Sequence, residues 1–116
     1  MISSKVQIVA IVKPFLAEKL LLSISEMKVD EISVRQVKGY SRQKNYLDQY
    51  GENEYSQVFV PKVEISIWVD SAIQESVLSR VSEIARTGRL GDGKIFVMPV
   101  VQCHTVGGVN GGRGQK

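Results

Sequence analysis

A chain of 116 residues, of which 43% are hydrophobic and 23% charged, predicts one domain, residues 1–116, around a single modest core. The net charge of +3 comes from residues of both signs scattered along the chain, and without a basic block we expect no nucleic-acid partner. No apolar run is long enough to span a membrane, and the single cysteine, Cys103, is typical of a reducing compartment, so we expect a cytoplasmic protein without direct membrane insertion.

The first half of the chain predicts a strand, a helix and a second strand. Residues 6–12 (VQIVAIV) are rich in β-branched residues, which favour a strand, and Pro14 then suits an early helix position. Apolar residues recur at helical spacing from Leu16 to Met27. The second strand, EISVRQVKGY, is expected to begin near Glu31.

The second half begins with a strand and a helix. Residues 63–69 (VEISIWV) alternate between apolar and polar side chains, which is typical of a strand with one buried face. Asp70 or Ser71 can cap the helix that follows, because a side-chain oxygen at that position accepts from free backbone amides. An apolar stripe then continues at helical spacing as far as Ala85.

The last strand is expected at KIFVMPVV, after Gly88 has ended the helix. Pro99 within this strand restricts it to a sheet edge or a bulge. The resulting order, β-α-β-β-α-β, is the ferredoxin-like plan, an α+β sandwich with both helices on one face of the sheet. Because this plan hosts many unrelated functions, the fold alone does not decide the activity.

A polar segment at residues 41–59 is longer than the hairpin that this plan needs between its second and third strands. It carries three spaced tyrosines, Tyr46, Tyr50 and Tyr55. Long connections of this kind are where binding concentrates, so we interpret the segment as a recognition loop. The alternative is a longer, exposed β-ribbon.

A second unusual segment, RTGRLGDGKIFV at residues 86–97, places glycines and basic residues directly before the last strand. Gly91 and Gly93 allow the backbone to approach a ligand closely, with several N–H groups pointing into one anion-binding concavity. Arg89 and Lys94 add charge that suits phosphate. The alternative is a plain turn, which uses the same residues.

Four stretches together resemble the PII nitrogen-regulatory signal proteins. They are TGRLGDGKIFVMPV (87–100), KPF (13–15), VKGYSRQK (37–44) and FVPKVEI (59–65), and the likeness runs without gaps from about residue 6 to residue 101. The resemblance implies that the protein is a homotrimer that regulates nitrogen metabolism and has no catalytic activity of its own. It implies that ATP or ADP, or AMP in place of them, binds in clefts between subunits. Many members of the family also bind Mg²⁺ and 2-oxoglutarate there. It also implies that residues 41–59 dock onto a partner protein, either a membrane transporter or a metabolic enzyme.

The resemblance also assigns roles to individual residues. The implied nucleotide-binding residues are Gly39, Ser41, Arg42, Gln43, Gly91, Asp92, Gly93 and Lys94. Gln43 matches the glutamine that helps to hold Mg²⁺ and 2-oxoglutarate, and Lys62 matches the lysine that pairs with a carboxylate of the oxo-acid. Tyr55 falls where many bacterial members carry a modifiable tyrosine.

The chain departs from the family pattern at two places. In the family a basic residue, then glycine and a small residue usually follow the first tyrosine, whereas here residues 51–54 are GENE, so recognition of Tyr55 by a modifying enzyme is not implied. The family often has two arginines after the last strand, where this chain has Thr105 and Gly107 within a glycine-rich tail, residues 102–116, that we expect to be flexible. These departures leave open a PII-like sensor of ADP, AMP or another small anion such as bicarbonate, which would regulate a transporter outside nitrogen metabolism.

Two further classes share the ferredoxin-like plan but fit these residues less well. An acylphosphatase-type enzyme would need a rigid anion site with a water oriented by an asparagine, and only the Gly91 loop has any such organisation. An RNA-recognition module would stack bases on aromatic residues of its sheet, and the aromatic run that this requires is missing from the predicted strands.

Overall fold

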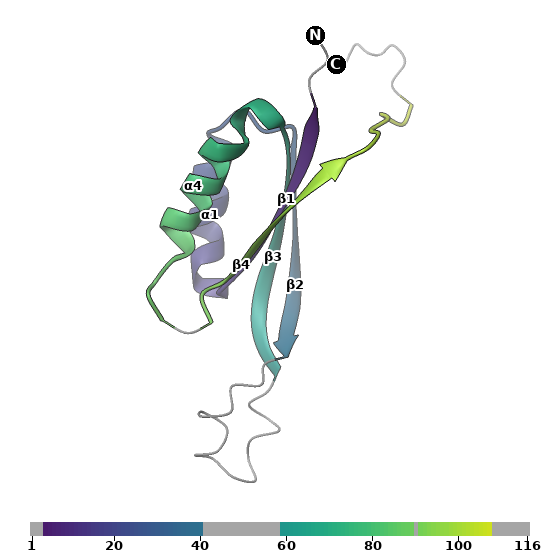
Figure 1. The fold of residues 1–116 in the computed structure, drawn as a ribbon. Helices are drawn as coiled ribbons and strands as arrows, with labels where there is room; N and C mark the ends of the chain where they lie inside the picture. The colour runs from purple at the N-terminus through teal and green to yellow at the C-terminus, as the bar shows by residue number, and fades with distance from the viewer. Residues whose placement is uncertain (1–3, 41–58, 90, 108–116) are drawn as a thin grey trace, which may run out of the picture.

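The computed structural model describes residues 4–40, 59–89 and 91–107, and within them it confirms the ferredoxin-like βαββαβ order (Figure 1). Short 3-10 turns, η1 and η3, lead into the two α-helices. In chain order the elements are β1 Lys5–Val12, η1 Pro14–Leu16, α1 Ala17–Ser25, β2 Glu31–Tyr40, β3 Phe59–Asp70, η3 Ser71–Ile73, α4 Gln74–Ala85 and β4 Gly93–Val100.

The four strands form one antiparallel sheet in the order β2-β3-β1-β4. β1 lies in the interior, pairing with β3 from Lys5↔Asp70 to Val12↔Val63 and with β4 over the same eight residues. Both helices cover one face of this sheet (Figure 1). No helix in the described part of the chain is long and apolar enough to cross a membrane.

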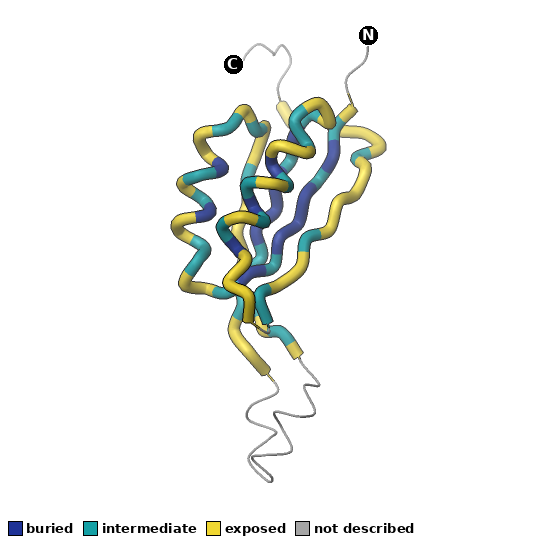
Figure 2. The backbone as a smooth tube through the Cα atoms, turned by 60° about the vertical axis from the view of Figure 1, so that its left-hand side comes forward, coloured by how far each residue is buried: buried dark blue, intermediate teal, exposed yellow. Residues whose placement is uncertain are grey.

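The core lies between the two helices and the covered face of the sheet, where the buried segments of the tube face one another (Figure 2). The alternation predicted for residues 63–69 is confirmed, since Val63, Ile65, Ile67 and Val69 are all buried. The core residues are Val6, Ile8, Ala10, Val12, Leu20, Ile24, Val63, Ile65, Ile67, Val69, Val77, Val81 and Ala85. Burial at this scale stabilises the fold by about 1.5–3 kcal/mol for each large apolar side chain.

The second helix begins and ends differently from the prediction. Neither Asp70 nor Ser71 caps α4 with its side chain: Asp70 precedes the 3-10 turn in an extended conformation and makes no capping hydrogen bond. The helix ends at Ala85 because Arg86 is already extended, so Gly88 lies in the turn beyond the helix rather than at its end. Gly88 has a φ of 83°, which suits that turn.

The third strand is longer than predicted, because it begins at Phe59 instead of Val63. β3 pairs with β1 only from Val63 onward, so the missing amide of Pro61 interrupts no pairing on that side. Phe59, the last residue of the predicted recognition loop, therefore belongs to the sheet, and the rest of that loop lies outside the described residues.

The face of the sheet opposite the helices carries apolar side chains that the helices do not cover. In the strand register Val9 pairs with Phe96, and Gln7 pairs with both Trp68 and Met98. Phe96 and Met98 are 47% and 40% exposed. We call Trp68, Phe96 and Met98, which surround the buried Val9, the open-face patch. β4, which carries two of these residues, is an edge strand, as Pro99 predicted.

Candidate functional site: a cleft beside the glycine loop

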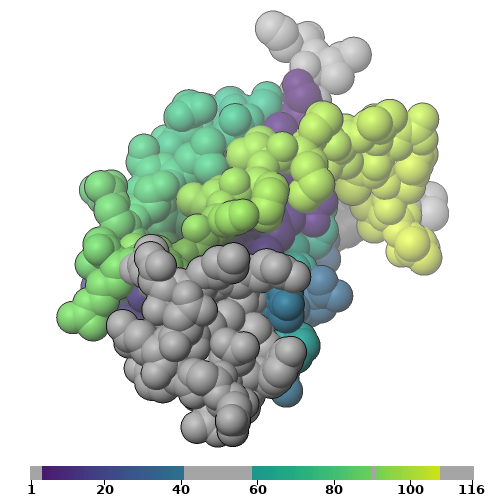
Figure 3. Space-filling view, turned by 60° about the horizontal axis from the view of Figure 1, so that its bottom comes forward, coloured from purple at the N-terminus to yellow at the C-terminus, as the bar shows by residue number. Residues whose placement is uncertain are grey.

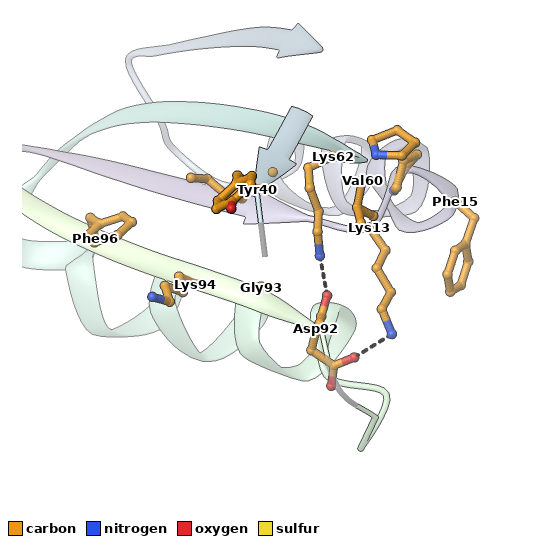
Figure 4. Close-up of a pocket in the computed structure, with 14 residues that line it drawn as sticks. Lys13, Phe15, Tyr40, Val60, Lys62, Asp92, Gly93, Lys94 and Phe96 are labelled. Carbon is orange, nitrogen blue, oxygen red and sulfur yellow. Dashed lines mark hydrogen bonds and ion pairs between the residues drawn. The ribbon is translucent and has the colours of Figure 1, made fainter. Parts of the chain in front are cut away.

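A cleft of about 890 Å³ opens where the turn before β4 meets the ends of β1, β2 and β3 (Figure 4). Its charged lining consists of three lysines and one carboxylate, which come from four different segments. The lining residues are Ile11, Lys13, Pro14, Phe15, Gly39, Tyr40, Val60, Pro61, Lys62, Gly91, Asp92, Gly93, Lys94 and Phe96. The cleft therefore combines a net positive charge with an apolar floor, a combination that suits an organic anion.

Gly91 and Gly93 have backbone conformations that favour glycine, with φ of 79° and 123°. A Cβ atom on Gly93 would lie 1.9 Å from the carbonyl oxygen of Ile11, which is closer than any packed atom can be. In this structure the group that approaches Gly93 closely is the backbone of β1, and the predicted approach of this turn to a ligand stays a prediction. Gly93 thus fixes the glycine loop, residues 87–93, against the sheet.

Lys62 reaches the glycine loop from β3. Its ammonium group donates a hydrogen bond to the carbonyl oxygen of Gly91 (Figure 4). Burial lowers the pKa of Lys62 below its usual range, and the neighbouring Lys13 ammonium lowers it further, while Asp92 opposes the shift. A cation held in this way gains from an incoming carboxylate or phosphate, which would restore its preference for the charged form.

Asp92 lies at the centre of a second group of contacts, which the sequence did not predict. Its carboxylate accepts hydrogen bonds from the backbone amides of Thr87 (2.8 Å) and Gly88 (2.9 Å), from the Thr87 hydroxyl and from the Lys13 ammonium (3.1 Å). The hydrogen bond from the Thr87 hydroxyl is the main reason that the pKa of Asp92 lies far below its usual range. The contact follows from the strand register. Val12 pairs with Gly93 in the antiparallel ladder, so Lys13, which follows Val12, lies beside Asp92, which precedes Gly93.

The cleft brings together those predicted site residues that the structure describes: Gly39, Lys62, Gly91, Asp92, Gly93 and Lys94. Ser41, Arg42, Gln43 and Tyr55 lie outside the described residues. Sequence reasoning gave no role to Lys13, Phe15 or Phe96, which also line the cleft. Phe15 is 73% exposed and points away from the sheet (Figure 4).

The segment after β4 lies at the opposite end of the molecule from the glycine loop. The space-filling view has the yellow residues after β4 on one side and the green turn after α4 on the other (Figure 3). Thr105 and Gly107 are exposed in this segment, and so are Cys103 and His104, whose ring contacts Gln102 at 3.1 Å. Within the described ranges, no group of three or more histidine, cysteine or acidic residues could hold a metal ion.

Comparison with known proteins supports the resemblance read from the motifs. A family model described as "Nitrogen regulatory protein P-II" matches residues 5–108. The chain belongs to the P-II family. Among curated relatives it is 38% identical over 94 residues to a nitrogen regulatory protein P-II of Azospirillum brasilense, covering 81% of this chain and 84% of the relative.

Further P-II proteins agree over similar lengths. Nitrogen regulatory protein P-II 1 of Escherichia coli K12 is 38% identical over 93 residues, 80% of this chain and 83% of the relative. The crystal structure of Arabidopsis thaliana PII bound to citrate superposes with a TM-score of 0.65 and 32% identity, covering 84% of this chain and 78% of that one. The ferredoxin-like fold of this chain is therefore the P-II fold, and the cleft is its candidate functional site.

Proposed function

We propose that this P-II protein is a cytoplasmic regulator in nitrogen metabolism, without catalytic activity, that binds adenine nucleotides in the cleft beside the glycine loop. The observation that carries the proposal is the convergence of Lys94 with the turn around Gly91 in one cleft. Lysine ammonium groups and glycine-rich backbone are groups that hold phosphates. The remaining predicted nucleotide-binding residues, Ser41, Arg42 and Gln43, follow β2 in the sequence and would close the cleft from its other side.

A second ligand, 2-oxoglutarate, is proposed to bind beside the nucleotide with Mg²⁺. Lys62 would pair with a carboxylate of the oxo-acid, and Gln43 together with oxygen atoms of both ligands would coordinate the metal. The lowered pKa of Lys62 supports this role, because the ammonium group gains an anionic partner on binding. The related Arabidopsis PII was crystallised with citrate, which is also a polycarboxylate.

The experiment that tests this function is calorimetric titration with ATP, ADP and AMP, each with and without 2-oxoglutarate and Mg²⁺. We expect ADP or AMP to bind within about tenfold of ATP, a difference of about 1.4 kcal/mol. The reason is that His104 is the only residue from 95 to 107 that can carry a positive charge. The two arginines that the family often has at the positions of Thr105 and Gly107 would each contribute roughly 1.5–3 kcal/mol. Together they would favour the triphosphate by more than about a hundredfold.

A hundredfold preference for ATP over AMP would contradict this expectation. Arg113→Ala would then test whether the tail supplies a substitute cation. In the converse experiment, Thr105→Arg combined with Gly107→Arg should raise the preference for ATP. Because β4 alone extends for about 23 Å between the glycine loop and this segment, the added arginines would have to act on the cleft of a neighbouring subunit.

The proposed assembly is a homotrimer, and the open-face patch supports it. When another subunit covers the sheet face that carries Trp68, Phe96 and Met98, these apolar side chains leave water, and their burial stabilises the assembly. Light scattering is expected to give a mass three times that of the 12.9 kDa chain. Met98→Glu should lower that mass, whereas Leu22→Glu on the outer surface of α1, where Leu22 is 63% exposed, should leave it unchanged. A monomer at micromolar concentration with nucleotide present would contradict the proposal.

Residues 41–59 are proposed to dock onto the regulated partner, either a membrane transporter or a metabolic enzyme, with Tyr55 as a candidate modification site. The polar composition and the length of this segment support the proposal. The alternative function is a sensor of ADP, AMP or a small anion such as bicarbonate that regulates a different transporter. The uncharged Thr105 and Gly107 favour that alternative, and the same titrations, extended to bicarbonate, separate the two.

A further inference from the structure

The carboxylate of Asp92 joins three parts of the chain at the rim of the cleft. Oδ2 accepts from the amides of Thr87 and Gly88, at the start of the glycine loop. Oδ1 accepts from the Thr87 hydroxyl and from the Lys13 ammonium, which follows β1. Lys13 also lies 3.4 Å from the Thr87 hydroxyl. One side chain therefore ties the first residue of the loop to its end and anchors both to the sheet.

These contacts use the hydrogen-bonding capacity of the Asp92 side chain. An ionised carboxylate has about four lone-pair sites, two on each oxygen. Asp92 receives two donors on each oxygen. A Mg²⁺ ion or a ribose hydroxyl could bind Asp92 only by displacing one of them. The saturated carboxylate thus suits a residue that holds the loop, and it does not suit a residue that contacts the ligand.

The glycine loop needs such a restraint. Gly88 and Gly91 have φ of 83° and 79°, and glycine loses more conformational freedom on folding than any other residue. An unrestrained loop would have to be ordered when the ligand binds, which would reduce affinity. Because the amides of Thr87 and Gly88 are already bonded to Asp92, the start of the loop is held in place before any ligand arrives.

We propose that Asp92 is a positioning residue, which with Lys13 as its counterion pre-forms the glycine loop for the ligand and does not itself touch the ligand. The proposal rests on the proposed function, because it takes the cleft as the nucleotide site. The carboxylate stays ionised at neutral pH, since its hydrogen bonds hold the pKa of Asp92 far below the usual range. Pre-formation of the loop is therefore independent of pH throughout the physiological range.

The test compares Asp92→Asn with Asp30→Asn, which makes the same charge change in an ion pair with Lys5, outside the cleft. Two quantities are measured: amide hydrogen exchange at Thr87 and Gly88 without ligand, and ADP affinity with and without Mg²⁺. In Asp92→Asn we expect faster exchange at both amides and ADP affinity reduced by about tenfold, a typical effect for residues that orient binding groups. The reduction should be equal in both Mg²⁺ conditions, and Asp30→Asn should change neither quantity.

Each other outcome has a defined meaning. A loss of affinity confined to the Mg²⁺ titration would make Asp92 a metal ligand and overturn the proposal, as would unchanged exchange at Thr87 and Gly88. If the parent protein binds no nucleotide, the proposed function fails, and the exchange data alone decide whether Asp92 holds the loop. If Asp92→Asn does not fold, Thr87→Val and Thr87→Ser replace it: the serine variant, which keeps the hydroxyl, should retain parental affinity, whereas the valine variant should not.

Discussion

Gly93→Ala is expected to lower the free energy of unfolding by about 3 kcal/mol or more, because strain and overpacking each cost roughly 1–3 kcal/mol. The new methyl group would lie 1.9 Å from the carbonyl oxygen of Ile11, and that oxygen belongs to backbone in an interior strand. The φ of 123° at Gly93 adds strain for any residue with a side chain. Since small domains are stable by only about 5–15 kcal/mol, this is a large loss.

Gly88→Ala is the matched control for this change. Gly88 has a φ of 83°, but no atom lies within 4 Å of the place that its Cβ would occupy. Its replacement therefore introduces strain without overpacking, which costs about 1–2 kcal/mol. Urea denaturation of both variants measures the difference. Equal losses would mean that β1 and β4 can separate enough to admit a methyl group. This outcome would contradict the close approach of Gly93 to the Ile11 carbonyl oxygen.

Lys62→Ala is expected to weaken binding of 2-oxoglutarate by roughly 10- to 150-fold while leaving nucleotide binding largely intact. A hydrogen bond to a charged group contributes about 1.5–3 kcal/mol, and the carboxylate would lose its cation in the variant. Lys38→Ala is the control, because it removes an equal charge from β2 at a position that does not line the cleft. Calorimetry in the presence of nucleotide and Mg²⁺ measures both affinities. Equal oxo-acid affinity in Lys62→Ala and the parent would contradict the assignment.

The same lysine predicts how anion binding depends on pH. Lys62 binds an anion in its protonated form, and burial together with Lys13 lowers its pKa, while Asp92 opposes the shift. Affinity for the oxo-acid should therefore decline at alkaline pH sooner than it would for an exposed lysine, because the free protein loses the proton first. In Lys62→Ala the alkaline decline should disappear, and calorimetry at several pH values measures this.

The sequence predicted the elements well where the pattern of apolar residues was strong. The alternation of residues 63–69 identified the buried face of β3, and Pro99 predicted an edge strand. Element ends were harder to predict, because they depend on backbone conformations that many residues can adopt. Gly88 looked like a helix end, yet the extended Arg86 ends α4 earlier.

The candidate site was predictable only in part. The glycine loop was predicted from its glycines and basic residues, Lys62 came from the resemblance to the family, and both line one cleft. The link between Lys13 and Asp92 depends on the β1–β4 register, which brings together side chains that are far apart in the sequence. No local pattern in the sequence encodes such a contact.

Because β1 lies inside the sheet, it cannot complete its pairing early in the synthesis of the nascent chain. β1 is synthesised first, but it pairs with residues 63–70 and 93–100, which emerge from the ribosome much later. Until then VQIVAIV, an uncharged stretch rich in β-branched residues, has no native strand to pair with. Segments of this kind are prone to aggregation, and distant pairing slows folding. The sheet around β1 is therefore complete only after residues 93–100 have been synthesised, and the risk of aggregation is greatest before then.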